Sequence, residues 1–112
     1  MYRLTVLYGH PEDPAEFDRY YHGIHIPLAK TMKGLTGWTI GKCISAERGN
    51  APPYYLIVSL YAESAAAMQA VLDSPEGQAT VADVPNFATG GVTFIYDEEE
   101  VLIPVELDAP GT

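Results

Sequence analysis

The chain is 112 residues long, which is enough for one domain with a single hydrophobic core. Hydrophobic residues make up 47% of it, and this proportion excludes an intrinsically disordered chain. Six Lys and Arg residues stand against fifteen Asp and Glu residues, which gives a net charge of -9. Because so acidic a surface repels phosphate backbones and anionic lipids, we expect neither nucleic acid nor a membrane as a partner.

The first half of the chain predicts a strand, a long helix and a second strand. Residues 3–9 alternate in the manner of a strand and end at Gly9, His10 and Pro11. Asp13 can cap the helix that follows, and Pro14 suits its first position. Apolar side chains then recur at helical spacing to about residue 32, namely Phe17, Tyr21, Ile24 and Leu28. Residues 37–46 form the next predicted strand.

The second half predicts a strand, a divided helix and a final strand. Residues 54–62 read as the third strand, after a turn-rich connection. Ser64 can cap one short helix, and Ser74 with Pro75 can start another that Pro85 ends. Residues 90–96 form the last strand. The order βαββαβ predicts a ferredoxin-like α+β domain, with a four-stranded antiparallel sheet and both helical layers on one face.

The predicted strands carry apolar side chains on both faces, which an open sheet normally does not. Leu7, Tyr55, Ile57, Tyr61 and Ile95 alternate with the residues that face the helices. Burying one such side chain stabilises a fold by roughly 1.5–3 kcal/mol, so we expect the open face to be covered. A second copy of the same sheet is the simplest cover, and it predicts a homodimer formed through the sheet faces.

Residues 97–112 form a segment separate from the folded domain at 1–96. Its acidic side chains, which include Asp97, Glu98 and Asp108, predict a solvated tail. Residues 101–107 are apolar enough to pack across a dimer, although Pro104 limits strand pairing.

Cysteine usage and hydropathy indicate a cytoplasmic protein. Cys43 is the single cysteine, so no intrachain disulfide is possible, which fits a reducing compartment. We interpret Cys43 as a buried, inert thiol in a strand. No signal peptide is apparent, and no segment approaches the roughly 20 apolar residues of a membrane span.

The stretch from Tyr20 to Leu28 is the most informative part of the sequence. Pro27 lacks an N–H group, and its ring pushes against the carbonyl of Gly23, so we expect a kink or loosened turn there. Tyr21 and His25 are four residues apart and share the helix face of Phe17. His25 should therefore face the space between helix and sheet. His22 could join it or point to solvent.

Two interpretations of His25 stay open. It can be a core histidine satisfied by a neighbouring polar group, or a titratable group at a strained turn, as in many active sites. Metal binding has little support, because His22 and His25 lack a third ligand nearby. Asp83, Asn86 and Thr89 read mainly as turn and cap residues. We take Tyr8, His22, Trp38, Asn86 and Phe87 as candidate substrate-binding residues, although Tyr8, Trp38 and Tyr61 fit a packed core at least as well.

Two segments resemble the EthD family, named for ethyl tert-butyl ether degradation. They are the helix pattern from Phe17 through Tyr20, Tyr21, His25 and Pro27 to Leu28, and the run from Ser74–Gln78 through Asn86–Gly91. The resemblance covers residues 1–96 and implies a dimeric α+β barrel, in which two ferredoxin-like subunits pair their sheets. It also implies a role in oxidative breakdown of organic compounds. A His–Tyr proton-transfer pair occurs among cyclase-like relatives, and the analogy makes His25 and Tyr21 the candidate catalytic residues.

We therefore expect a small enzyme, of oxidoreductase, isomerase or lyase type, that needs no cofactor or metal. An apolar cavity would hold a hydrophobic small molecule, and His25 would transfer protons beside a tyrosine hydroxyl. The alternative is a non-catalytic binding protein that assists an oxidative pathway. A third interpretation is a haem-binding barrel with His25 or His22 as the axial ligand.

Overall fold

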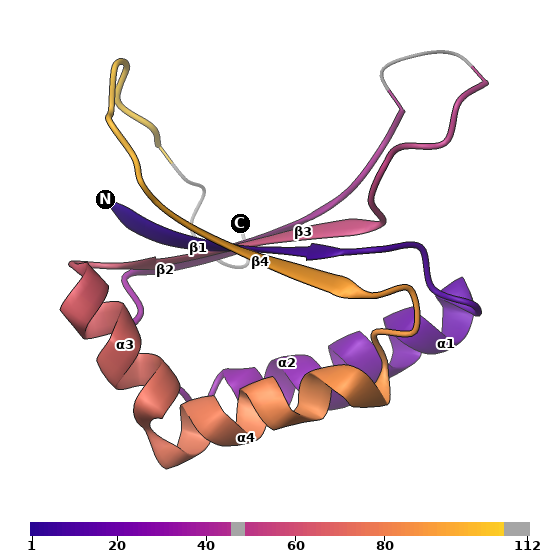
Figure 1. Ribbon diagram of the computed structural model, residues 1–112, viewed down its shortest axis with the longest axis horizontal. Coiled ribbons are helices and arrows are strands. Elements are labelled where there is room, and N and C mark those ends of the chain that lie inside the picture. Colours follow the sequence, from indigo (N-terminus) through magenta and orange to yellow (C-terminus); the bar gives the residue numbers. More distant parts are fainter. Residues whose placement is uncertain (46–48, 107–112) are drawn as a thin grey trace.

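The computed structural model describes residues 1–45 and 49–106. Its sheet has four antiparallel strands in the order β2-β3-β1-β4. The helices lie in a layer on one side of it (Figure 1). This arrangement confirms the predicted ferredoxin-like α+β fold. The elements are β1 (Tyr2–Tyr8), α1 (Pro14–Tyr20), the π-helical turn η1 (Tyr21–His25), α2 (Ile26–Ala29), β2 (Gly37–Lys42), β3 (Leu56–Ala62), α3 (Ala65–Asp73), α4 (Pro75–Asp83), the 3₁₀ turn η2 (Val84–Asn86) and β4 (Val92–Glu98).

The helices begin where the sequence places their caps. Asp13 accepts a hydrogen bond from the backbone N–H of Glu16. Ser64 does the same for Ala67 at the start of α3, and Ser74 does so for Gly77 at the start of α4. Each cap satisfies an amide that the first helical turn leaves without a partner. The division of the second helical layer at Ser74 is thereby confirmed.

The core lies between the sheet and the helices. β1 contributes Leu4, Val6 and Tyr8, which the strand register sets opposite Leu60, Val58 and Leu56 of β3. All six side chains are buried. Helical side chains close this layer from the other side, chiefly Phe17, Tyr21, Met68, Val84 and Phe87. The alternation in the strands thus decides which side chains meet the helices.

The open face of the sheet is mixed, which corrects the expectation of an apolar surface. Ile57 and Ile95 lie on this face and are 39% and 45% exposed. Threonine and serine side chains lie between such apolar residues, for example Thr5 opposite Ser59. Tyr61 lies on the open face, as the strand alternation predicts, and its alternative interpretation as a core residue is wrong. Tyr55 precedes β3 and packs against Phe17 on the helical side.

Two strands differ in length from their predictions. β2 ends at Lys42 instead of residue 46, so Cys43 lies just beyond the strand and is only partly buried. β4 continues to Glu98, two residues into the predicted tail. The reason is Arg3, whose guanidinium contacts the carboxylates of Asp97 at 2.7 Å and Glu99 at 3.0 Å. Part of the acidic run is therefore paired with β1.

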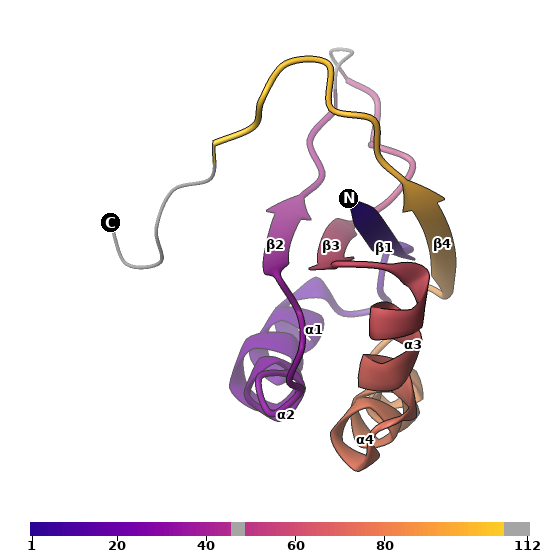
Figure 2. The ribbon, with the colours of Figure 1, turned by 90° about the vertical axis from the view of Figure 1, so that its left-hand side faces the viewer.

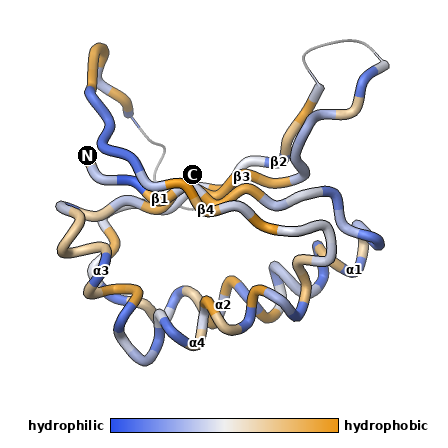
Figure 3. Tube along the Cα trace, in the orientation of Figure 1, coloured by the Kyte–Doolittle hydropathy of each residue, from blue (hydrophilic) through white to orange (hydrophobic). Residues whose placement is uncertain are grey.

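The described part of the tail leaves the sheet on the side opposite the helices (Figure 2). Leu102 and Ile103 are 83% and 82% exposed. Figure 3 shows this hydrophobic stretch standing clear of the domain. Residues 107–112, which include Asp108 of the predicted tail, lie outside the described residues. None of the helices within residues 1–45 and 49–106 is long and apolar enough to cross a bilayer.

Candidate functional site

The predicted irregular turn between α1 and α2 is present as the π-helical turn η1. The backbone N–H of Ile26 bonds to the carbonyl of Tyr21, five residues back. This wider turn accommodates Pro27, which cannot donate a hydrogen bond to Gly23. Tyr21 and His25 both face inward and are only 2% and 5% exposed. π-helical turns occur frequently at functional sites, so the π-helical turn at His25 favours a functional role for this residue.

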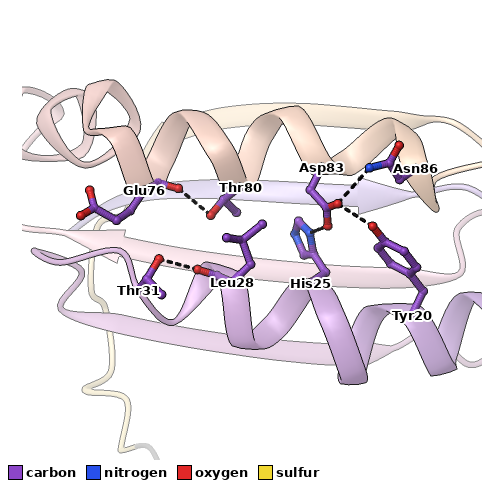
Figure 4. A network of polar contacts seen from close by, with 8 residues as sticks. All are labelled: Tyr20, His25, Leu28, Thr31, Glu76, Thr80, Asp83 and Asn86. Carbon is purple, nitrogen blue, oxygen red and sulfur yellow. Dashed lines mark hydrogen bonds and ion pairs between the residues drawn. The ribbon is translucent and has the colours of Figure 1, made fainter.

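Asp83 faces His25 from the neighbouring helix, at the point where α4 passes into η2. Its carboxylate lies between the two helices (Figure 4). The ring of Tyr20 is directed toward it from α1, and the imidazole of His25 from η1. Oδ2 is 2.9 Å from His25 Nδ1. Oδ1 accepts from the Tyr20 hydroxyl at 2.6 Å and from the Asn86 side-chain amide at 3.0 Å. Three side chains therefore hold this carboxylate in one orientation.

The hydrogen bonds settle the tautomer of His25. Burial raises the pKa of Asp83, but the bonds from Tyr20, His25 and Asn86 outweigh it, and the pKa lies below its ordinary value of 3.8. Asp83 is thus ionised at neutral pH and can only accept hydrogen bonds. Nδ1 must then carry the proton, and Nε2 is the ring nitrogen with a free lone pair.

Burial also keeps His25 neutral. It lowers the pKa of the imidazole below the ordinary 6.5, and the opposing effect of Asp83 does not reverse this. A neutral imidazole can accept a proton, and the nearby carboxylate stabilises the imidazolium that forms. Burial raises the pKa of the Tyr21 hydroxyl as well. That hydroxyl stays protonated and is available as a neutral hydrogen-bond donor.

A cavity of about 50 Å³ lies beside His25, between the helices and the sheet. No Asp, Glu, Lys or Arg lines it, and most of the lining side chains are aliphatic or aromatic. Among the lining residues, Tyr8 and Tyr21 carry hydroxyl groups and Trp38 carries an indole N–H group. The hydroxyl of Thr80 also lines it but already donates to the carbonyl of Glu76. The site therefore combines one proton-transfer group with an apolar enclosure.

The structure divides the residues proposed from the sequence into three groups. Tyr8, Tyr21, His25 and Trp38 line one cavity. Phe87 lies behind His25, with the ring centres 4.6 Å apart, and Asn86 holds Asp83 instead of facing the cavity. His22 is exposed and lines a separate outer cleft.

Sequence reasoning missed the roles of Asp83 and Tyr20. The position of Asp83 at a helix end, shortly before Pro85, predicts only a turn or cap residue. Asp83 is 58 positions from His25 in the chain, and only the packing of α4 beside η1 brings the two together. The order Asp83, Pro85, Asn86 gives no local signal for such a pairing. A buried histidine that needs a partner was the available clue.

No group of three or more His, Cys, Asp or Glu residues within the described ranges is arranged to hold a metal ion. His25 and Asp83 form a pair without a third member of these types. The candidate site is thus a histidine–carboxylate pair next to an apolar cavity.

The fold and site define a small ferredoxin-like α+β protein in which a buried histidine pairs with an aspartate between two helices. The profile of the EthD domain matches residues 9–91, about three quarters of the chain. The chain belongs to the EthD domain family, and the resemblance seen in the sequence is confirmed.

Individual proteins are also similar to the chain over most of its length. An uncharacterized 11.0 kDa protein from the thcB–thcC intergenic region of Rhodococcus erythropolis is 45% identical over 104 residues, which cover 93% of this chain and 100% of that protein. An EthD family protein from Bacillus halodurans superposes with a TM-score of 0.83 at 28% identity, covering 89% of this chain and 99% of the other. An EthD-like protein from Ralstonia eutropha gives a TM-score of 0.70 at 18% identity, with 91% and 92% covered.

Proposed function

We propose that the protein is an enzyme of small-molecule metabolism that transfers a proton within an apolar cavity, with His25 as the catalytic residue. The observation that carries the proposal is the pairing of Nδ1 of the buried His25 with the partly buried, ionised Asp83 at 2.9 Å. A histidine needed only for packing is satisfied by any neutral acceptor. An oriented carboxylate adds a fixed tautomer and a stabilised imidazolium, both of which serve acid–base chemistry.

In this mechanism the reactive end of a hydrophobic small molecule lies beside the imidazole. His25 Nε2 removes a proton from an activated C–H or O–H group of the ligand, and Asp83 stabilises the charged ring that results. The protonated Nε2 then returns the proton to the same molecule at another atom, or to a leaving group. Tyr21 lies against the His25 ring at 5.4 Å between centres, and its protonated hydroxyl can stabilise an enolate-like oxygen. Such proton transfers support isomerisation or elimination.

A solved relative supports the general class of chemistry. Hydroxynitrile lyase from Passiflora edulis shares the fold with a TM-score of 0.68 at 9% identity, covering 92% of this chain and 97% of that enzyme. This enzyme is an example of a lyase with a similar ferredoxin-like fold. The oxidoreductase and ether-degradation roles that the family name implies stay predictions for this chain.

A ketone with weakly acidic α C–H groups tests the proposal without knowledge of the natural substrate. We expect the protein to accelerate exchange of the α protons of 2-indanone with deuterium oxide, followed by NMR. His25→Ala should reduce this acceleration by about 10²–10⁴-fold. His10→Ala is the matched control, because His10 is exposed and bonds to the carbonyl of Pro52. Equal exchange by wild type and His25→Ala would remove His25 from the mechanism.

The second candidate is a binding protein that assists an oxidative pathway without catalysis. The nearly complete burial of His25 favours it, because the ring is already satisfied at one nitrogen. Binding of 2-indanone without any protein-dependent exchange would support this function. The haem alternative is disfavoured, since the cavity beside His25 has a volume of only about 50 Å³. The absence of a Soret shift on addition of haem would exclude it.

We further propose that two copies pair through the open faces of their sheets. Ile57 and Ile95 provide exposed apolar area there, and the Arg3–Asp97 pair adds polar specificity. The exposed tail at 101–105 rises on the same side of the sheet as this face (Figure 1). We propose that residues 101–105 pack on the partner there. Each subunit keeps its own His25 cavity on the helical side.

A further inference from the structure

The space beside His25 is too small to hold an organic ligand. A cavity of about 50 Å³ has room for only a few water molecules, whereas small-molecule sites usually measure roughly 300–1,000 Å³. A much larger cleft of about 770 Å³ lies next to it, at the edge of the sheet formed by β2. Ala29, Met32 and Trp38 line both spaces. These three residues therefore form the wall between the cavity and the outer cleft.

Trp38 is the polar member of this wall. It lies on the helical face of β2, opposite Leu60 of β3. Its indole Nε1 is buried and has no hydrogen-bond partner among the residues that the structure describes. The indole N–H group can only donate. A buried donor without an acceptor is costly in a folded protein, and such groups call for an explanation.

The chemistry around Trp38 limits what can supply the acceptor. The inner cavity presents no ionised side chain, since His25 is neutral and Asp83 does not line it. An ionic group would lose its hydration there without gaining a counter-charge. A carbonyl or ether oxygen on an otherwise apolar molecule loses little hydration and accepts well. The outer cleft is also lined mainly by apolar side chains, with Lys30 and His22 at its exposed part.

We propose that Trp38 determines ligand specificity by donating its indole N–H to the oxygen of an uncharged, largely apolar molecule. This inference rests on the proposed function, because it places the oxygen in the same cavity as His25. The apolar body of the ligand occupies the outer cleft, and its oxygen-bearing end passes the Trp38–Met32 wall. The substrate class is thus a neutral ketone, ester or ether, in preference to a carboxylate, a phosphate or a pure hydrocarbon.

A matched pair of probes tests the donor role. 2-Indanone carries a carbonyl oxygen, and 2-methyleneindane has nearly the same shape with a CH₂ group in its place. Trp38 is the single tryptophan, so the ¹H–¹⁵N spectrum of the full-length protein contains one indole resonance. We expect 2-indanone to shift this resonance downfield in the proton dimension, while 2-methyleneindane leaves the proton shift nearly unchanged. Equal effects from both probes, or no effect from either, would overturn the proposal.

Substitution provides a second measurement. Trp38→Phe keeps an aromatic ring and removes the donor. It should weaken binding of 2-indanone about fivefold to tenfold, measured by calorimetry, and leave 2-methyleneindane unaffected. Unchanged affinity for 2-indanone would contradict the proposal, and the wild-type spectrum decides the question if this variant does not fold. An indole shift without deuterium exchange upholds Trp38 and refutes His25 as a base. Deuterium exchange without an indole shift upholds His25 as a base and refutes Trp38 as the donor.

Discussion

Asp83→Asn is the most direct perturbation of the candidate site, because it removes one charge and preserves the shape of the side chain. Tyr20 and Asn86 both donate to Oδ1, so the amide oxygen of the new Asn should take that position. The amide NH₂ group then occupies the place of Oδ2, 2.9 Å from His25 Nδ1. Two donors cannot share this contact. We therefore expect His25 to move its proton from Nδ1 to Nε2.

The expected loss of stability follows from the hydrogen bonds. A bond to a charged partner contributes about 1.5–3 kcal/mol and a neutral one about 0.5–1.5 kcal/mol, so the substitution costs about 1–2 kcal/mol. Asp83 ends α4, where a negative charge opposes the helix dipole, and the loss of that charge returns roughly 0.5 kcal/mol. The net cost is about 1 kcal/mol, or a decrease of roughly 4–8 °C in Tm for a domain of this size.

The two ring nitrogens of His25 report the tautomer in long-range ¹H–¹⁵N NMR spectra. Wild type should show a protonated Nδ1 and an unprotonated Nε2, and Asp83→Asn the opposite pattern. Because the wrong tautomer presents an N–H group to the ligand, acceleration of exchange in 2-indanone should fall by up to about 10⁴-fold. Asp83 would then be a positioning residue that acts through His25.

Asp73→Asn is the matched control. Asp73 ends α3, is exposed and accepts a hydrogen bond from Gln69, so this change also removes a charge from a helix C-terminus. It should alter neither the His25 tautomer nor exchange. The reasoning would be refuted if wild type and Asp83→Asn showed the same tautomer. It would also fail if Asp73→Asn reduced exchange as strongly.

Four further outcomes follow from the structure. Since burial lowers the pKa of His25 in the folded state, the free energy of unfolding should decrease as pH falls from about 7 to about 5, and urea titrations of His25→Gln should show a weaker dependence. The hydrogen bond from Tyr20 lowers the pKa of Asp83. Tyr20→Phe removes this bond, so the pKa of Asp83 should rise in ¹³C NMR titrations. Gly90→Ala should cost about 1–3 kcal/mol by thermal unfolding, because a Cβ there would overlap the backbone of Gly9 and His10. A Cβ at Gly41 meets nothing within 4 Å, so Gly41→Ala should be nearly neutral. Leu102→Asp should shift a dimer toward monomer in sedimentation velocity if the tail packs on a partner, and an unchanged mass would contradict that packing.

The histidine turn shows how far local patterns reach. Gly23 and Pro27 are incompatible with an ordinary helix, and this alone predicts the irregular turn that the structure contains as η1. The inward direction of His25 also follows from its spacing to Tyr21. The partner of His25 did not follow, since an aspartate before a proline has a sufficient local explanation as a turn residue.

The sheet shows the same division. Alternating side chains determined which residues of β1 and β3 face the helices, and the order of elements determined the ferredoxin-like topology. The polar fraction of the open face was underestimated, because Thr5, Ser59 and Thr93 lie on that face between its apolar residues. The end of β4 depended on Arg3, a residue at the opposite end of the chain.

The sequence by itself determined the elements, their caps, the turn at Gly23–Pro27 and the family, because these depend on neighbours along the chain. Only the tertiary structure decided the chemistry of the site. Asp83 meets both His25 and Tyr20 across two packed helices, and Trp38 reaches the same cavity from the sheet. Contacts between such distant positions are set by how the helices pack on the sheet. Neither side-chain spacing nor local propensity encodes them in a form that can be read along the chain.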